Sequence, residues 1–89
     1  MKEVKTTVVN PNGIHARPAS FFVNEAKKYQ SKIMVENLSS GKAKDAKQIL
    51  GVMSLGMTNG TEIRLTAEGP DEEEAIAGML HLVESGCGE

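Results

Sequence analysis

Alternating hydrophobic and polar residues predict four short β-strands. The alternation is clear over residues 2–9, 32–37 and 62–67, and a weaker pattern over 42–45 fits a short edge strand. Each segment places apolar side chains on one side and polar side chains on the other. A sheet built from them should bury one face and expose the other to water, as antiparallel sheets commonly do.

Apolar residues at helical spacing predict two helices in the first two thirds of the chain. One follows the turn-forming run at residues 10–13 and extends to about Tyr29. The other covers residues 46–55 and ends at Gly56, because glycine readily adopts the left-handed conformation that closes many helices.

A third helix is predicted near the C-terminal end. Asp71 is expected to cap it, the glutamates at 72–74 suit the positive end of the helix dipole, and Gly86 ends it. The resulting order is β-α-β-β-α-β-α in a single domain spanning residues 1–89. This order predicts an α+β fold in which helices cover one face of an antiparallel sheet.

Composition argues against several classes of function. Ten basic and twelve acidic side chains give a net charge of -2, so no basic excess is available to bind nucleic acid. No apolar run approaches the ~20 residues of a membrane span, and the first residues lack the apolar region of a signal peptide. We therefore expect a cytoplasmic protein without membrane insertion. The only cysteine, Cys87, is expected in a mobile tail, and no metal-ligand spacing or cofactor motif is visible.

The candidate chemistry is concentrated in the run GIHARPA at residues 13–19. Pro18 fits the first turn of a helix, because proline has no N–H and none is needed there. His15 is therefore predicted at or just outside a helix N-terminus, where unpaired amides and the helix dipole attract anions. Arg17 can add a guanidinium to that site. The combination suits a histidine that carries a phosphoryl group; a solvated loop histidine is the alternative.

Three blocks of the chain, in order and at matching spacing, resemble the HPr family. These proteins are the histidine-containing phosphocarriers of the bacterial phosphoenolpyruvate-dependent sugar phosphotransferase system. The blocks are residues 13–19, 51–56 and 63–74. The resemblance implies an open-faced β-sandwich, a four-stranded antiparallel sheet with three helices on one face. It also implies that His15 accepts the phosphoryl group on Nδ1, that Arg17 stabilises its charge, and that Ala16 and Arg17 bind it.

The same resemblance implies a function. A protein of this family takes a phosphoryl group from phospho-enzyme I and donates it to enzyme IIA domains for coupled sugar uptake and phosphorylation. It is a carrier and not an enzyme in its own right, it needs no cofactor or metal, and we expect a monomer. The alternative is a regulatory paralogue of the nitrogen-related branch of the system, which acts mainly by phosphorylation-dependent docking to regulatory proteins.

The resemblance further implies a docking surface around His15, made by one side of the first helix and part of the second. Its residues are Ala16, Arg17, Ser20, Phe21, Asn24, Lys27, Ile49, Leu50 and Met53. For the last three, ordinary core packing is the alternative, but Val52 and Leu55 are the better core candidates by helical spacing. Gln48 occupies the position at which many relatives carry a regulatory serine, so that regulation is not expected here.

Overall fold

The computed structural model describes residues 1–11, 13–14 and 16–87. Its elements follow the predicted order and are β1 (Lys2–Thr7), α1 (Ala16–Ala26), β2 (Lys32–Asn37), β3 (Lys42–Asp45), α2 (Ile49–Ser54), β4 (Glu62–Glu68) and α3 (Glu72–Glu84). No helix within these described ranges is long and apolar enough to cross a membrane.

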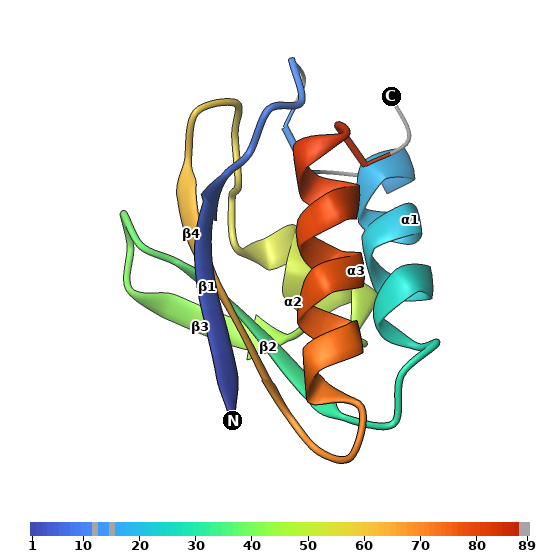
Figure 1. Cartoon of the computed structure of the whole chain (residues 1–89). Helices are drawn as coiled ribbons and strands as arrows, with labels where there is room; N and C mark the ends of the chain where they lie inside the picture. Colours follow the sequence, from blue (N-terminus) through green and yellow to red (C-terminus); the bar gives the residue numbers. More distant parts are fainter. Residues whose placement is uncertain (12, 15, 88–89) are drawn as a thin grey trace.

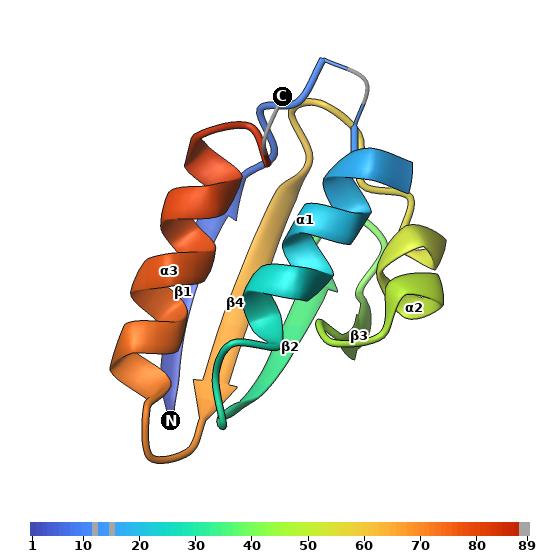
Figure 2. The same cartoon turned by 90° about the vertical axis from the view of Figure 1, so that its right-hand side faces the viewer.

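The four strands form one antiparallel sheet in the order β1-β4-β2-β3. β4 is an inner strand: its Leu65 pairs with Val4 of β1 on one side and with Val35 of β2 on the other. The three helices cover one face of this sheet and leave the other face open (Figures 1 and 2). The predicted α+β fold, an open-faced β-sandwich, is therefore confirmed.

The core lies between the sheet and the helices. Alternate residues of the inner strands, such as Ile33 and Leu65, are fully buried and belong to one cluster with Phe22 of α1 and Met79 of α3. Burying a side chain of this size stabilises the folded state by about 1.5–3 kcal/mol. The alternation that predicts the strands thus also determines which side of the sheet the helices cover.

The first strand is shorter than predicted. β1 ends at Thr7 and not at residue 9. The reason is that Val8 bonds to the turn before β4: its N–H donates to the Thr61 carbonyl (2.9 Å), and its own carbonyl accepts the Gly60 N–H (2.8 Å). These bonds hold the chain beyond β1 against a segment more than fifty residues away in the sequence.

Two helices are also shorter than predicted. α1 ends at Ala26 and not near Tyr29, because the N–H groups of Lys28 and Tyr29 bond to carbonyls three residues back, which closes the helix in a tighter turn. α2 begins at Ile49 and not at residue 46. Before it, Asp45 organises a turn in which its carboxylate accepts the backbone N–H two residues further on (2.8 Å).

Asp71 occupies the N-cap position of α3, but its carboxylate does not cap the helix. It instead accepts the backbone N–H groups of Gln30 and Ser31 (both 2.9 Å) and the Ser31 hydroxyl, in the loop between α1 and β2. These hydrogen bonds, the Ser31 hydroxyl foremost, hold the pKa of the Asp71 carboxyl below its ordinary value. The predicted side-chain cap was wrong because the actual partners lie 40 and 41 residues away in the sequence.

The expectation of a mobile tail is wrong for Cys87. This residue is fully buried and belongs to the core cluster. Gly86 and Cys87 have positive φ angles of 87° and 50°, and the Cys87 N–H donates to the Leu82 carbonyl (2.9 Å). This pattern is a common way of ending a helix, and here it returns the chain to the core after α3.

Candidate functional site

The loop between β1 and α1 leads to the predicted phosphoryl acceptor. His15 itself lies outside the described residues. Before it, the Gly13 N–H donates to the Asn10 carbonyl (3.0 Å), and the Ile14 N–H donates to the Met57 carbonyl (2.8 Å). Gly13 has a φ of 76°, and a Cβ at this position would lie 2.6 Å from the Met57 oxygen. Both facts require glycine immediately before the candidate site.

This loop is joined to the segment that follows α2. The Ile14–Met57 bond and the two bonds of Val8 hold Val8 and Ile14 against the segment 57–61. The helices α1 and α2 lie beside one another (Figure 2). The fold thereby brings together the two segments in which the sequence predicts functional residues.

The start of α1 has the features of an anion-binding site. Ala16 and Arg17 are the first two residues of this eleven-residue helix and are exposed, whereas Pro18 is buried in the first turn. The described first turn, residues 16–19, contains no acidic side chain. The N-terminal amides and the dipole of such a helix favour a negative charge, and the Arg17 guanidinium has donors that match the oxygens of a phosphoryl group.

Four of the exposed large apolar side chains belong to α1 and α2. They are Phe21 (44% exposed), Ile49 (39%), Leu50 (80%) and Met53 (40%), and we refer to them as the apolar patch. Val52 and Leu55 are buried. The predicted division of the second helix into an inner and an outer side is therefore confirmed, and core packing does not explain the outer residues.

The polar residues predicted for the same surface are also exposed. Ser20, Asn24 and Lys27 follow Arg17 at spacings of three and four residues, which places them on one side of α1 and its C-terminal extension. Their exposure is compatible with docking, and their role in docking stays a prediction.

Asn37, a residue that sequence reasoning missed, holds the end of α2 in place. This nearly fully buried side chain donates to the Leu55 carbonyl (2.8 Å) and accepts the Ser39 N–H (2.9 Å). Leu55 is the C-cap of α2, so the bond satisfies a carbonyl that the helix leaves unpaired. The alternation in β2 gave a usable signal, because it directs residue 37 inward and a buried amide needs partners.

Gln48 is the N-cap residue of α2. It is exposed, and its side chain makes no capping hydrogen bond. A carboxamide offers no hydroxyl for phosphorylation at this position. Ser54 does have a hydroxyl, but that group donates to the Gly51 carbonyl within the same helix (2.7 Å).

A family model described as the PTS HPr component phosphorylation site matches residues 2–85. The chain belongs to the HPr family. The matched range includes His15, Arg17 and the apolar patch. Proteins of this family are phosphocarriers.

Individual HPr-related proteins extend this comparison. The chain is 40% identical over 84 residues to the HPr-like protein Crh of Bacillus subtilis, covering 94% of this chain and 96% of Crh. It is 38% identical over 88 residues to the multiphosphoryl transfer protein of Haemophilus influenzae, covering 98% of this chain. The chain spans only 18% of the length of that protein, so the activity of the whole relative is not transferred to it.

Solved HPr structures agree with the fold. HPr-C-His from Thermoanaerobacter tengcongensis is 49% identical, with a TM-score of 0.93 and coverage of 100% of this chain and 98% of that chain. A dimer of HPr from the same organism matches with a TM-score of 0.78, again at 49% identity and over the full length of both chains.

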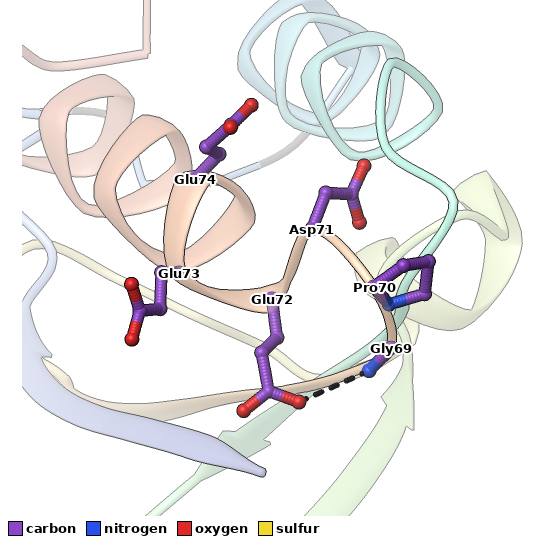
Figure 3. Close-up of a pocket in the computed structure, with 6 residues that line it drawn as sticks. All are labelled: Gly69, Pro70, Asp71, Glu72, Glu73 and Glu74. Carbon is purple, nitrogen blue, oxygen red and sulfur yellow. Dashed lines mark hydrogen bonds between the residues drawn. The ribbon is translucent and has the colours of Figure 1, made fainter.

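An acidic hollow lies at the start of α3, at the opposite end of the molecule from the start of α1 (Figures 1 and 3). Asp71, Glu72 and Glu73 in this hollow have partners within the protein: Glu72, for example, accepts the Gly69 N–H (3.2 Å) and pairs with the N-terminal ammonium group of Met1 (3.0 Å). The Met1 ammonium and the Gly69 N–H lower the pKa of the Glu72 carboxyl. Within the described part of the chain, no group of three or more His, Cys, Asp or Glu side chains could hold a metal ion.

Proposed function

We propose that this protein accepts a phosphoryl group on His15 from phospho-enzyme I and donates it to enzyme IIA domains, for coupled uptake and phosphorylation of sugars in the cytoplasm. The observation that carries this proposal is the match of residues 2–85 to the HPr phosphorylation-site family. The exposed start of α1, with Arg17 in its first turn, supports it.

The proposed step is a displacement at phosphorus. The lone pair of His15 Nδ1 forms a nitrogen–phosphorus bond as the bond between phosphorus and the donor atom of phospho-enzyme I breaks, and the electron pair of the broken bond stays on the donor. The proton that the phosphorylated imidazole gives up at Nε2 is balanced by one taken up at the donor. No electrons are exchanged, so the step needs no redox cofactor.

The chain's own residues have a limited part in this step. The first amides of α1, at Ala16 and Arg17, and the Arg17 guanidinium hold negative charge on the phosphoryl oxygens. Because two different partners must reach the same group, the site has to be exposed, and most of the transition-state stabilisation falls to the larger partner. We therefore infer a carrier and not an independent catalyst.

The apolar patch is proposed as the docking surface, together with Ala16, Arg17, Ser20, Asn24 and Lys27. Exposed apolar groups lose contact with water when a partner covers them. Met53 and Leu50 adapt their side chains to surfaces of different shape, which suits a protein that must fit several partners.

The second candidate is a regulatory HPr paralogue of the nitrogen-related branch. It is favoured by Gln48, which stands at the start of α2 where many relatives carry a regulatory serine. In that case phosphorylation of His15 would change docking to regulatory proteins. A binding titration of phosphorylated and unmodified protein tests this candidate: equal affinity for every partner contradicts phosphorylation-dependent docking.

Phosphorylation is tested by incubation with phosphoenolpyruvate and enzyme I. We expect one acid-labile, base-stable phosphate per chain, its absence in His15→Ala, and slower transfer in Arg17→Ala with unchanged unfolding. Equal labelling of His15→Ala and the parent would refute the proposal. Transfer onward to a sugar-specific enzyme IIA domain separates the sugar branch from the regulatory branch. Sedimentation equilibrium of both phosphorylation states tests the monomer that we propose.

A further inference from the structure

Asn10 is a fully buried polar residue in the loop that leads to His15. Its side chain has no exposed surface, and neither its Nδ2 nor its Oδ1 has a hydrogen-bonding partner among the described residues. Only its backbone is engaged in a local bond, because its carbonyl accepts the Gly13 N–H (3.0 Å). In the described part of the chain, no other residue has its entire side-chain polar group buried and unpaired.

The chain provides its own comparison. Asn37 is nearly as deeply buried, but its amide donates to the Leu55 carbonyl and accepts the Ser39 N–H. That arrangement is the rule for buried amides, since a polar group removed from water without a partner destabilises the folded state. Asn10 departs from the rule at a place that is five residues before the candidate phosphoryl acceptor.

The loop that contains Asn10 is fixed at both ends. Val8 is held by Gly60 and Thr61, and Ile14 is held by Met57. Between these anchors the described backbone has one internal hydrogen bond, from Gly13 to Asn10. An unfavourable local arrangement persists where the surrounding structure enforces it, and such arrangements concentrate at functional sites.

We propose that Asn10 is a positioning residue of the phosphorylation loop, whose amide is unpaired in the unmodified protein and gains a partner within the loop when His15 is phosphorylated. The inference rests on the proposed function. Asn10 would then favour the phosphorylated form over the unmodified form without touching the phosphoryl group. The Asn10 side chain would therefore shift the equilibrium between unmodified and phosphorylated protein, independently of any effect on the rates of phosphoryl transfer.

The first measurement is the unfolding of unmodified protein in urea. Asn37→Ala is the matched control, because it leaves the Leu55 carbonyl and the Ser39 N–H without their partner, and we expect its unfolding midpoint to fall clearly. Asn10→Ala removes a group that has no such partner, and we expect less than half of that fall. An equal fall in the two variants would show that the Asn10 amide is already paired in the unmodified protein, which overturns the proposal.

The second measurement is the fraction of phosphorylated protein at fixed ratios of phosphoenolpyruvate to pyruvate, with catalytic enzyme I. Because this is an equilibrium, it does not depend on how well a variant docks to enzyme I. We expect Asn10→Ala to require a ratio about two- to tenfold higher than the parent for half-phosphorylation, the effect of losing one net hydrogen bond. Asn37→Ala should match the parent. An unchanged ratio for Asn10→Ala overturns the proposal.

Two further outcomes are distinguishable. If the parent itself is not phosphorylated at any ratio, the proposed function fails and the inference falls with it. If Asn10→Ala does not fold, Asn10→Leu fills the same space with an apolar side chain of similar branching and replaces it in both measurements. Failure of both variants to fold would mean that the amide is needed in the unmodified protein, and this result also refutes the inference.

Discussion

Gly78 permits a close approach of α3 to the end of α1, and replacing it with alanine should destabilise the protein. A Cβ at this position would overlap the Tyr29 hydroxyl oxygen and lie 2.9 Å from both Tyr29 Cζ and Glu25 Oε2. The Tyr29 hydroxyl donates to Glu25 Oε2 (2.7 Å), so a displaced tyrosine also loses this bond. The substitution therefore has two opposing effects on stability: a steric clash destabilises the protein, and the higher helix propensity of alanine stabilises it.

The relative sizes of these contributions decide whether Gly78→Ala stabilises or destabilises the protein. Alanine gains about 0.8–1 kcal/mol over glycine inside a helix. Overpacking costs about 1–3 kcal/mol, and the loss of a partly exposed hydrogen bond costs about 1 kcal/mol more. The two smaller contributions nearly cancel, which leaves a net destabilisation of about 1–3 kcal/mol. Unfolding in urea, followed by circular dichroism, measures this difference directly.

The same substitution in a Tyr29→Ala variant provides the control. In Tyr29→Ala the obstructing ring is absent, so Gly78→Ala should now stabilise the protein by about 0.8–1 kcal/mol through helix propensity alone. The sign of the effect should therefore reverse between the two backgrounds. If Gly78→Ala stabilises the parent as much as it stabilises the Tyr29→Ala variant, the close contact between these helices is not present and the reasoning is refuted.

Three further predictions concern a carboxylate, a phenol and the apolar patch. Hydrogen bonds in the folded protein lower the pKa of Asp71, so the stability that this carboxylate contributes is fully present above the unfolded-state pKa of about 3.9 and is lost as pH falls through the lower folded value. Asp71→Asn should therefore be less stable than the parent at pH 7 and should lose less additional stability in acid. Urea unfolding at each pH measures both differences. The hydrogen bond to Glu25 and burial raise the pKa of Tyr29 to about 12. Tyr29 is the only tyrosine of the sequence and tryptophan is absent, so ultraviolet titration reports on this phenol alone. The titration should show this pKa in the parent and a lower pKa in Glu25→Gln. Leu50 is 80% exposed, so Leu50→Ser should change the free energy of unfolding by no more than about 0.5 kcal/mol and yet slow phosphoryl transfer from phospho-enzyme I. Val52 is buried, so Val52→Ala should lower stability. Unchanged transfer kinetics in Leu50→Ser would contradict docking through the apolar patch.

Local pattern was enough to predict most of the fold. The alternation in residues 32–37 and 62–67 corresponds to β2 and β4, whose inward residues Ile33 and Leu65 are fully buried. Helical spacing separated buried Val52 from exposed Leu50 within a six-residue helix. These predictions succeeded because burial on one face of an element depends on the period of that element, which the sequence contains locally.

Several of the differences share a physical cause, which is distance along the chain. Asp71 was expected to cap its own helix, but its partners lie in the loop after α1. The end of β1 depends on Thr61, and the bond from Asn37 to the Leu55 carbonyl joins residues eighteen positions apart. No local pattern reveals a hydrogen bond that forms only after the chain has folded back on itself. At the site, the sequence predicted an exposed Arg17 at a helix start, while His15 remains a prediction because it lies outside the described residues.

The sheet order has a consequence for synthesis on the ribosome. β1 is made before β4, its neighbour in the described sheet, whose residues 62–68 follow more than fifty residues later. At roughly 5–20 residues per second, the N-terminal strand waits for seconds without a partner. The loop before α1 waits with it, because its anchors Met57 and Thr61 also come late. A nascent chain therefore contains residues 13–19 well before Met57 and Thr61 are available to hold the loop before α1.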